Sequence, residues 1–140
     1  MGQTARDYTE EATALFARFA SKHGLTYEVT NAPVEVMWEF PVQPKLSHRI
    51  VLSLQNNDEL NFGVGAFWSY FFPFEEKRVE FEVIIDKWFE GTARVIPKPG
   101  VLTHALELQV LENGTWNSVY PARSLGWQKS PKTMLTNNPN

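Results

Sequence analysis

The stretch from Asp58 to Phe74 is the densest apolar and aromatic passage in the chain, and it constrains the fold more than any other. Read as one strand, it places every second side chain on one face. The opposite face carries Asn61 and two glycines, Gly63 and Gly65, where another backbone or a ligand can approach closely. We therefore expect the rest of the chain to cover the apolar face. That face carries Leu60, Phe62, Val64, Ala66, Trp68, Tyr70 and Phe72.

The composition predicts one folded globular domain. The chain has 140 residues, of which 43% are hydrophobic and 14% aromatic. Because it contains no cysteine, it has no disulfide scaffold, thiolate zinc site or cysteine nucleophile. The N-terminal residues lack a signal-peptide core, and no segment approaches the ~20 apolar residues needed to span a bilayer. We therefore expect a cytoplasmic protein of a bacterium-like cell, with no membrane partner.

The charge is unevenly distributed. The formal net charge is -3, yet residues 113–140 contain three basic and no acidic side chains, so the remainder carries -6. An acidic body repels the phosphates of nucleic acids and favours a basic protein partner. A charge of this size also serves solubility alone.

Two segments have helical signals. Residues 5–23 place apolar side chains at helical spacing, and Gly24 follows as a stop signal. Residues 75–90 are ambiguous, because part of the segment alternates as a strand does. Its acidic start, its apolar stripe ending at Trp88 and the following Gly91 favour a helix.

The remaining pattern predicts strands and hairpins. Asn113-Gly114 is a strong hairpin signal, which pairs Leu111 with Trp116 and puts Trp116 and Tyr120 on one face. The sequence therefore predicts an α+β fold, an antiparallel sheet of about six to seven strands with both helices packed on one face. We expect residues 1–125 to form this single domain and residues 126–140 an irregular, partly mobile C-terminal tail. The alternating segments are 25–30, 34–40, 45–55, 58–74, 92–96, 101–112 and 115–120.

No specific catalytic signature is present. The chain lacks the nucleophile elbow of hydrolases, the P-loop, the zincin motif and the EF-hand loop. Gly63-Val64-Gly65 lacks the third glycine and the helix start of a dinucleotide site, so close backbone packing explains it better. We expect neither a cofactor nor a bound metal.

A non-enzymatic protein-binding module is the favoured function, of the adaptor, immunity-protein or chaperone type. Glu35, Met37 and Glu39 form a strip on the solvent face of their strand, suited to a basic partner. Trp116 and Tyr120 give the last hairpin an aromatic composition typical of interface cores, although residues 121–127 are an alternative cover for Trp116. The helix-first element order, small size, acidity and the stretch Leu15 to Leu25 are similar to those of secretion chaperones. A homodimer is compatible with this class.

A small-molecule-binding protein or enzyme is the competing interpretation. His48 and His104 each begin a strand on its apolar face, so both imidazoles would meet at one rim of the core if the strands share a sheet. Aromatic side chains beside the two glycines would line the pocket. The aromatic candidates are Trp38, Phe62, Trp68 and Tyr70.

Overall fold

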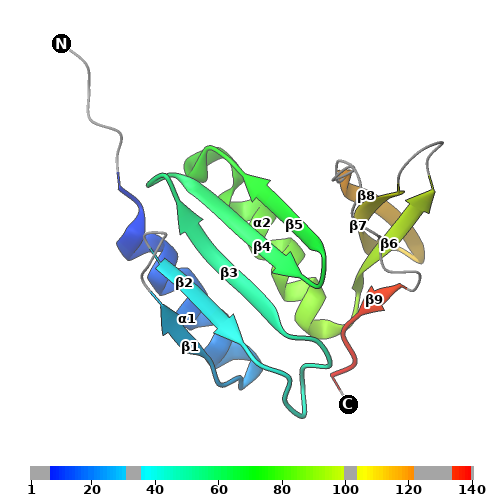
Figure 1. Cartoon of the computed structure of the whole chain (residues 1–140), viewed down its shortest axis with the longest axis horizontal. Helices are drawn as coiled ribbons and strands as arrows, with labels where there is room; N and C mark the ends of the chain where they lie inside the picture. The colour runs from blue at the N-terminus through cyan, green and yellow to red at the C-terminus, as the bar shows by residue number, and fades with distance from the viewer. Residues whose placement is uncertain (1–6, 31–35, 100–103, 122–133, 140) are drawn as a thin grey trace.

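A computed structural model describes residues 7–30, 36–99, 104–121 and 134–139. These residues form two helices and nine strands in two antiparallel sheets, which confirms the predicted α+β fold (Figure 1). Neither helix among the described residues is long and apolar enough to cross a membrane. The elements are α1 (Thr9–His23), β1 (Glu28–Thr30), β2 (Val36–Phe40), β3 (Ile50–Gln55), β4 (Glu59–Val64), β5 (Phe67–Phe71), α2 (Phe74–Glu90), β6 (Ala93–Pro99), β7 (His104–Glu112), β8 (Thr115–Pro121) and β9 (Leu135–Thr136).

The first sheet is a meander of five strands in the order β1-β2-β3-β4-β5. Its register places Trp38 opposite Leu52 and Leu52 opposite Phe62, so these side chains share one side of the sheet. We call this the core side. Its buried residues are Val36, Trp38, Phe40, Ile50, Leu52, Leu54, Leu60, Phe62, Val64, Phe67, Ser69 and Phe71.

The aromatic stretch is a hairpin and not one strand. Val64 pairs with Phe67, so Gly65 and Ala66 form a two-residue turn between β4 and β5. Gly65 has a φ of 56°, the positive value that a hairpin turn with glycine in its first position requires.

The turn reverses which residues face the core. Beyond it the odd-numbered Phe67 and Phe71 are buried, whereas Trp68 and Tyr70 lie on the opposite side of the sheet. The predicted single row from Leu60 to Phe72 is therefore wrong after Val64. We call the side that carries Trp68 and Tyr70 the open side. The register also assigns to it Glu28, Thr30, Met37, Glu39, Val51, Ser53, Gln55, Glu59, Asn61 and Gly63.

Aromatic contacts join the helices to the sheet. Phe16 of α1 meets Trp38 edge to face, with ring centroids 6.1 Å apart. Trp88 of α2 meets Phe62 in the same way at 5.4 Å. Both helices lie behind the five-stranded sheet in Figure 1.

The helix boundaries follow local signals. The helical interpretation of residues 75–90 is confirmed, and α2 ends at Gly91, which has a φ of 83°. Helix α1 begins later than predicted, at Thr9. The carboxylate of Asp7 accepts a hydrogen bond from the backbone N–H of Thr9 at 2.9 Å, so it serves one of the first free donors of the helix.

The second sheet has four strands in the order β8-β7-β6-β9, so the predicted single sheet is instead two. Leu111 pairs with Trp116 as predicted. A register shift between Leu108 and Gln109 then makes Tyr120 the partner of Leu108, which is fully buried. The prediction that Trp116 and Tyr120 share a face is therefore wrong, because the irregularity moves Tyr120 to the buried side.

The C-terminal residues 134–139 dock onto the domain. Asn137 is 3% exposed, and its Nδ2 donates hydrogen bonds to the carbonyls of Lys45 and Phe89 at 3.1 and 2.9 Å. Its Oδ1 accepts one from the backbone N–H of Ser47 at 2.9 Å. This side chain joins the C-terminal segment to the end of α2 and to the segment before β3. The rest of the predicted tail, residues 126–133 and 140, lies outside the described residues.

Replacing Asn137 by Ala should lower the free energy of unfolding by about 2–3 kcal/mol, because buried backbone groups lose their partners. Urea denaturation followed by tryptophan fluorescence measures this. Asn117→Ala, which changes an exposed asparagine of β8, is the matched control and should cost much less. Equal effects of the two substitutions would contradict the role given to Asn137.

Candidate functional site

The open side of the five-stranded sheet ends in exposed aromatic residues. Trp68 is half-buried and Tyr70 is 53% exposed on this side, and Phe72, which follows directly after β5 and its pairing with β4, is 59% exposed. We call these three residues the aromatic edge. No described helix or strand covers this side of the sheet in Figure 1. Exposed aromatic side chains such as those of Tyr70 and Phe72 are typical of interaction surfaces.

The indole ring of Trp68 packs against Gly63. Gly63 pairs with Trp68 across β4 and β5, and a Cβ atom on Gly63 would lie 2.5 Å from Cε3 of the indole. The ring therefore lies against the backbone of β4. The close approach expected at Gly63 is made by a side chain of the protein itself, while Gly65 serves the turn.

A buried polar chain lies beside the aromatic edge. The hydroxyl of Ser53 donates to Oδ1 of Asn61 at 3.0 Å, and Nδ2 of Asn61 donates to the carboxylate of Glu59 at 2.8 Å. Ser53 and Asn61 are fully buried, although both lie on the open side. Because Asn61 pairs with Tyr70, these bonds hold a carboxylate close to the aromatic edge.

The far strands of the open side carry further carboxylates. Met37 and Glu39 are half-buried there, which is the strip expected from their alternation, while Glu35 lies outside the described residues. Glu39 forms an ion pair with Arg49 at 2.7 Å, and the exposed Glu28 pairs with Glu39 across β1 and β2. The open side therefore has aromatic residues at its β5 end and carboxylates near both ends.

The other two candidates from the sequence have separate surroundings. Tyr120 is half-buried, with its ring 5.9 Å from that of Phe67 and 5.5 Å from that of Phe71. Its hydroxyl accepts a hydrogen bond from the backbone N–H of Tyr70 at 3.0 Å, which joins the two sheets. Trp116 lies on the opposite face of β8, beneath Arg94.

The structure does not gather the residues of the competing pocket. Trp38 and Phe62 are 4% and 0% exposed on the core side, whereas Trp68 and Tyr70 lie on the open side.

The two histidines of that pocket belong to different sheets. His48 precedes β3 of the first sheet and His104 opens β7 of the second, where the side chain of His104 lies outside the described residues. Within the described ranges, no group of three His, Cys, Asp or Glu residues could hold a metal ion.

A groove of about 450 Å³ between the helices contains none of the predicted pocket residues. It lies along the N-terminal halves of α1 and α2, and Tyr8, Leu15 and Phe74 are among its lining residues. The rings of Tyr8 and Phe74 stack there with centroids 4.4 Å apart.

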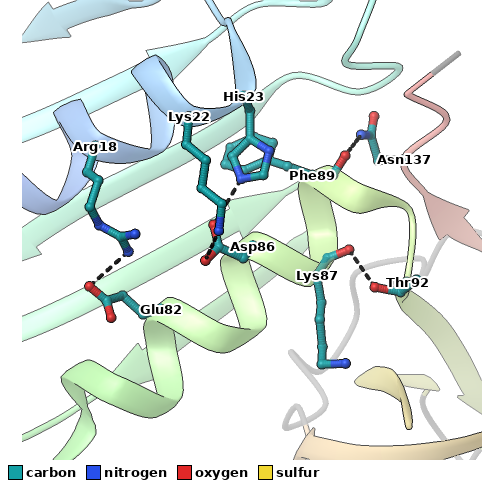
Figure 2. A network of polar contacts seen from close by, with 9 residues as sticks. All are labelled: Arg18, Lys22, His23, Glu82, Asp86, Lys87, Phe89, Thr92 and Asn137. Carbon is teal, nitrogen blue, oxygen red and sulfur yellow. Dashed lines mark hydrogen bonds and ion pairs between the residues drawn. The ribbon is translucent and has the colours of Figure 1, made fainter. Parts of the chain in front are cut away.

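A polar network that the sequence did not reveal joins α1 to α2 (Figure 2). Nε2 of His23 lies 2.9 Å from one carboxylate oxygen of Asp86, and Nζ of Lys22 lies 3.0 Å from the other. Arg18 pairs with Glu82 at 2.8 Å one turn earlier. The paired residues are more than 60 positions apart, so no local pattern links them.

The charge of Asp86 is stabilised by these contacts. Burial raises the pKa of the carboxyl group, but hydrogen bonds from His23 and Lys22 outweigh it, so the pKa of Asp86 lies below its ordinary value. The ring of His23 also packs on Phe89, with centroids 4.8 Å apart. Because these groups engage one another, the network serves as a link between the helices.

No known family model, curated protein or solved structure matches this chain.

Replacing Asp86 by Asn should lower the free energy of unfolding by about 1–3 kcal/mol at pH 7, because charge-assisted hydrogen bonds are lost. The pKa of Asp86 is depressed in the folded protein, so its stabilisation is present above the ordinary pKa of 3.8 and is lost as the pH falls below it. Urea titrations at pH 7 and in acid should therefore give a difference between the two proteins that shrinks in acid.

The matched control for Asp86 is Glu80→Gln. Glu80 is a more exposed acid of α2, and it pairs with Lys77 at 3.5 Å. Its substitution should have little effect at either pH. An Asp86→Asn difference that stays constant between pH 7 and acid would contradict the role given to the charge.

Replacing Gly63 by Ala should lower the free energy of unfolding by about 1–3 kcal/mol, because the new methyl group meets the ring of Trp68. In a Trp68→Ala background the same substitution should cost clearly less. A double-mutant cycle by urea denaturation measures the coupling. Additive effects would show that Trp68 does not depend on the glycine.

Proposed function

We propose that this chain is a non-enzymatic protein-binding module that uses the open side of its five-stranded sheet. The aromatic edge is the observation that carries the proposal. Tyr70 is 53% exposed on the same side of β5 as Trp68, and Phe72, directly after β5, is 59% exposed. Burying a large apolar side chain against a partner gains roughly 1.5–3 kcal/mol, and aromatic residues dominate the energetics of many interfaces.

The mode of binding follows from the edge of β5. An edge strand offers free backbone groups to an added strand. Here the hydroxyl of Tyr120 already accepts the outward N–H of Tyr70 at 3.0 Å. This contact opposes the addition of a strand along β5. The proposed partner therefore rests on the side chains of the open side.

The chemistry of the partner follows from the charges of that side. Glu28, Glu39 and Glu59 lie on it, and Glu39 is paired with Arg49. A basic segment that also carries apolar residues complements this surface, because guanidinium groups pair with carboxylates and stack on aromatic rings. We therefore propose a basic protein as the partner, which suits an adaptor, an immunity protein or a chaperone in the cytoplasm.

The test is selection of peptides displayed on phage against the immobilised protein. The enriched peptides should be rich in Arg or Lys and in apolar residues. Synthetic copies should bind the Tyr70→Ala/Phe72→Ala double variant at least tenfold more weakly than the wild type, as titrated by fluorescence polarisation.

The matched control removes exposed apolar residues elsewhere. Val79 and Val83 are 61% and 47% exposed on α2, and their double replacement by Ala should leave peptide affinity unchanged. Circular dichroism checks that each variant is folded. Selection that enriches no basic peptide, or equal losses in the two double variants, would overturn the proposal.

A further inference from the structure

A preorganised arginine lies on the second sheet, apart from the open side of the first. The guanidinium carbon of Arg94 lies 4.1 Å from the ring centroid of Trp116. Nε of Arg94 donates a hydrogen bond to Oε1 of Gln109 at 2.8 Å. Three adjacent strands, β6, β7 and β8, supply these residues.

The surroundings of Arg94 hold its orientation. Arg94 pairs directly with Gln109 across β6 and β7, and Gln109 is only 9% exposed. Nε2 of Gln109 in turn donates to the carboxylate of Glu107 at 2.6 Å, which fixes Oε1 toward Arg94. A stacked guanidinium with one nitrogen engaged loses little freedom when it binds a ligand.

The terminal nitrogens of Arg94 are the part left for recognition. One of them lies 3.9 Å from the sulfur of Met134, which is a weak acceptor. The partners of Arg94 among the described residues are the amide of Gln109, this thioether and the indole of Trp116, all of them uncharged. Arg94 thus differs from Arg18, Arg49 and Arg78, which pair with carboxylates.

We propose that Arg94 and Trp116 form a site for a carboxylate of an acidic peptide. The planar fork of the guanidinium matches a carboxylate, which accepts two parallel hydrogen bonds from it. The indole of Trp116 stacks against the guanidinium of Arg94 and offers an apolar surface to the methylene groups of the ligand. The charge preferred here is opposite to the one preferred by the open side, so the site is independent of the proposed basic partner.

The test titrates a fluorescein-labelled peptide of repeated Ser-Glu-Glu-Gly, with an amidated C-terminus, at low salt. The wild type should bind it, and Arg94→Gln should weaken binding at least tenfold. Arg94→Lys should weaken it at least fivefold although the charge is kept, because an ammonium group neither forks nor stacks in the same way. Trp116→Ala should weaken it several-fold.

Three controls show whether binding depends on the carboxylates of the peptide and on Arg94. The same peptide with Gln in place of Glu should not bind. Arg49→Gln, which removes an arginine already paired with Glu39, should leave affinity unchanged. Inorganic phosphate that displaces the labelled peptide at a concentration equal to that of the peptide would show a site for free oxyanions instead of peptide carboxylates. No binding by the wild type, equal losses for Arg49→Gln and Arg94→Gln, or full affinity of Arg94→Lys would overturn the proposal.

Discussion

The two-residue turn at Gly65 and Ala66 decides which aromatic side chains of this protein are inside it. Because side chains alternate along a strand, a turn of two residues exchanges the roles of odd and even positions in β5. Phe67 and Phe71 enter the core, and Trp68 and Tyr70 are left on the open side. The buried core and the proposed binding surface therefore have one origin. A continuous strand would have buried the second pair.

The helices behind the sheet run side by side and are joined by ion pairs. Tyr8 stacks on Phe74 where α1 and α2 begin, and His23 packs on Phe89 where they end, so the helices run in the same direction. Parallel neighbours place like ends of their dipoles side by side, which is unfavourable. The ion pairs of Arg18 and Lys22 with acids of α2 offset this cost. The polar network thus links the two helices that cover the sheet.

Sequence patterns were sufficient where the signal is local. Caps and an apolar stripe identified α2, and Asn113-Gly114 identified the last hairpin, because each depends on a few adjacent residues. The turn at Gly65 was not predicted, because the residues before and after it are apolar and the alternation of two residues continues through it. The register shift between Leu108 and Gln109 was not predicted, because the alternation of apolar and polar residues gives no sign of it. The contact between Arg94 and Trp116 was not predicted, because the pairing of three strands brings these residues together.

The hydrogen bonds of Asn137 have a consequence for the order of assembly. They connect this residue to the carbonyls of Phe89 and Lys45, which precede it by 48 and 92 positions. Closing loops of that length is slower than forming local hairpins, so we expect the hairpins to form before this contact. At roughly 5–20 residues per second, a ribosome needs about 2–10 s to pass from Phe89 to Asn137. During that interval the carbonyls of Phe89 and Lys45 lack the partner that Asn137 gives them in the finished protein.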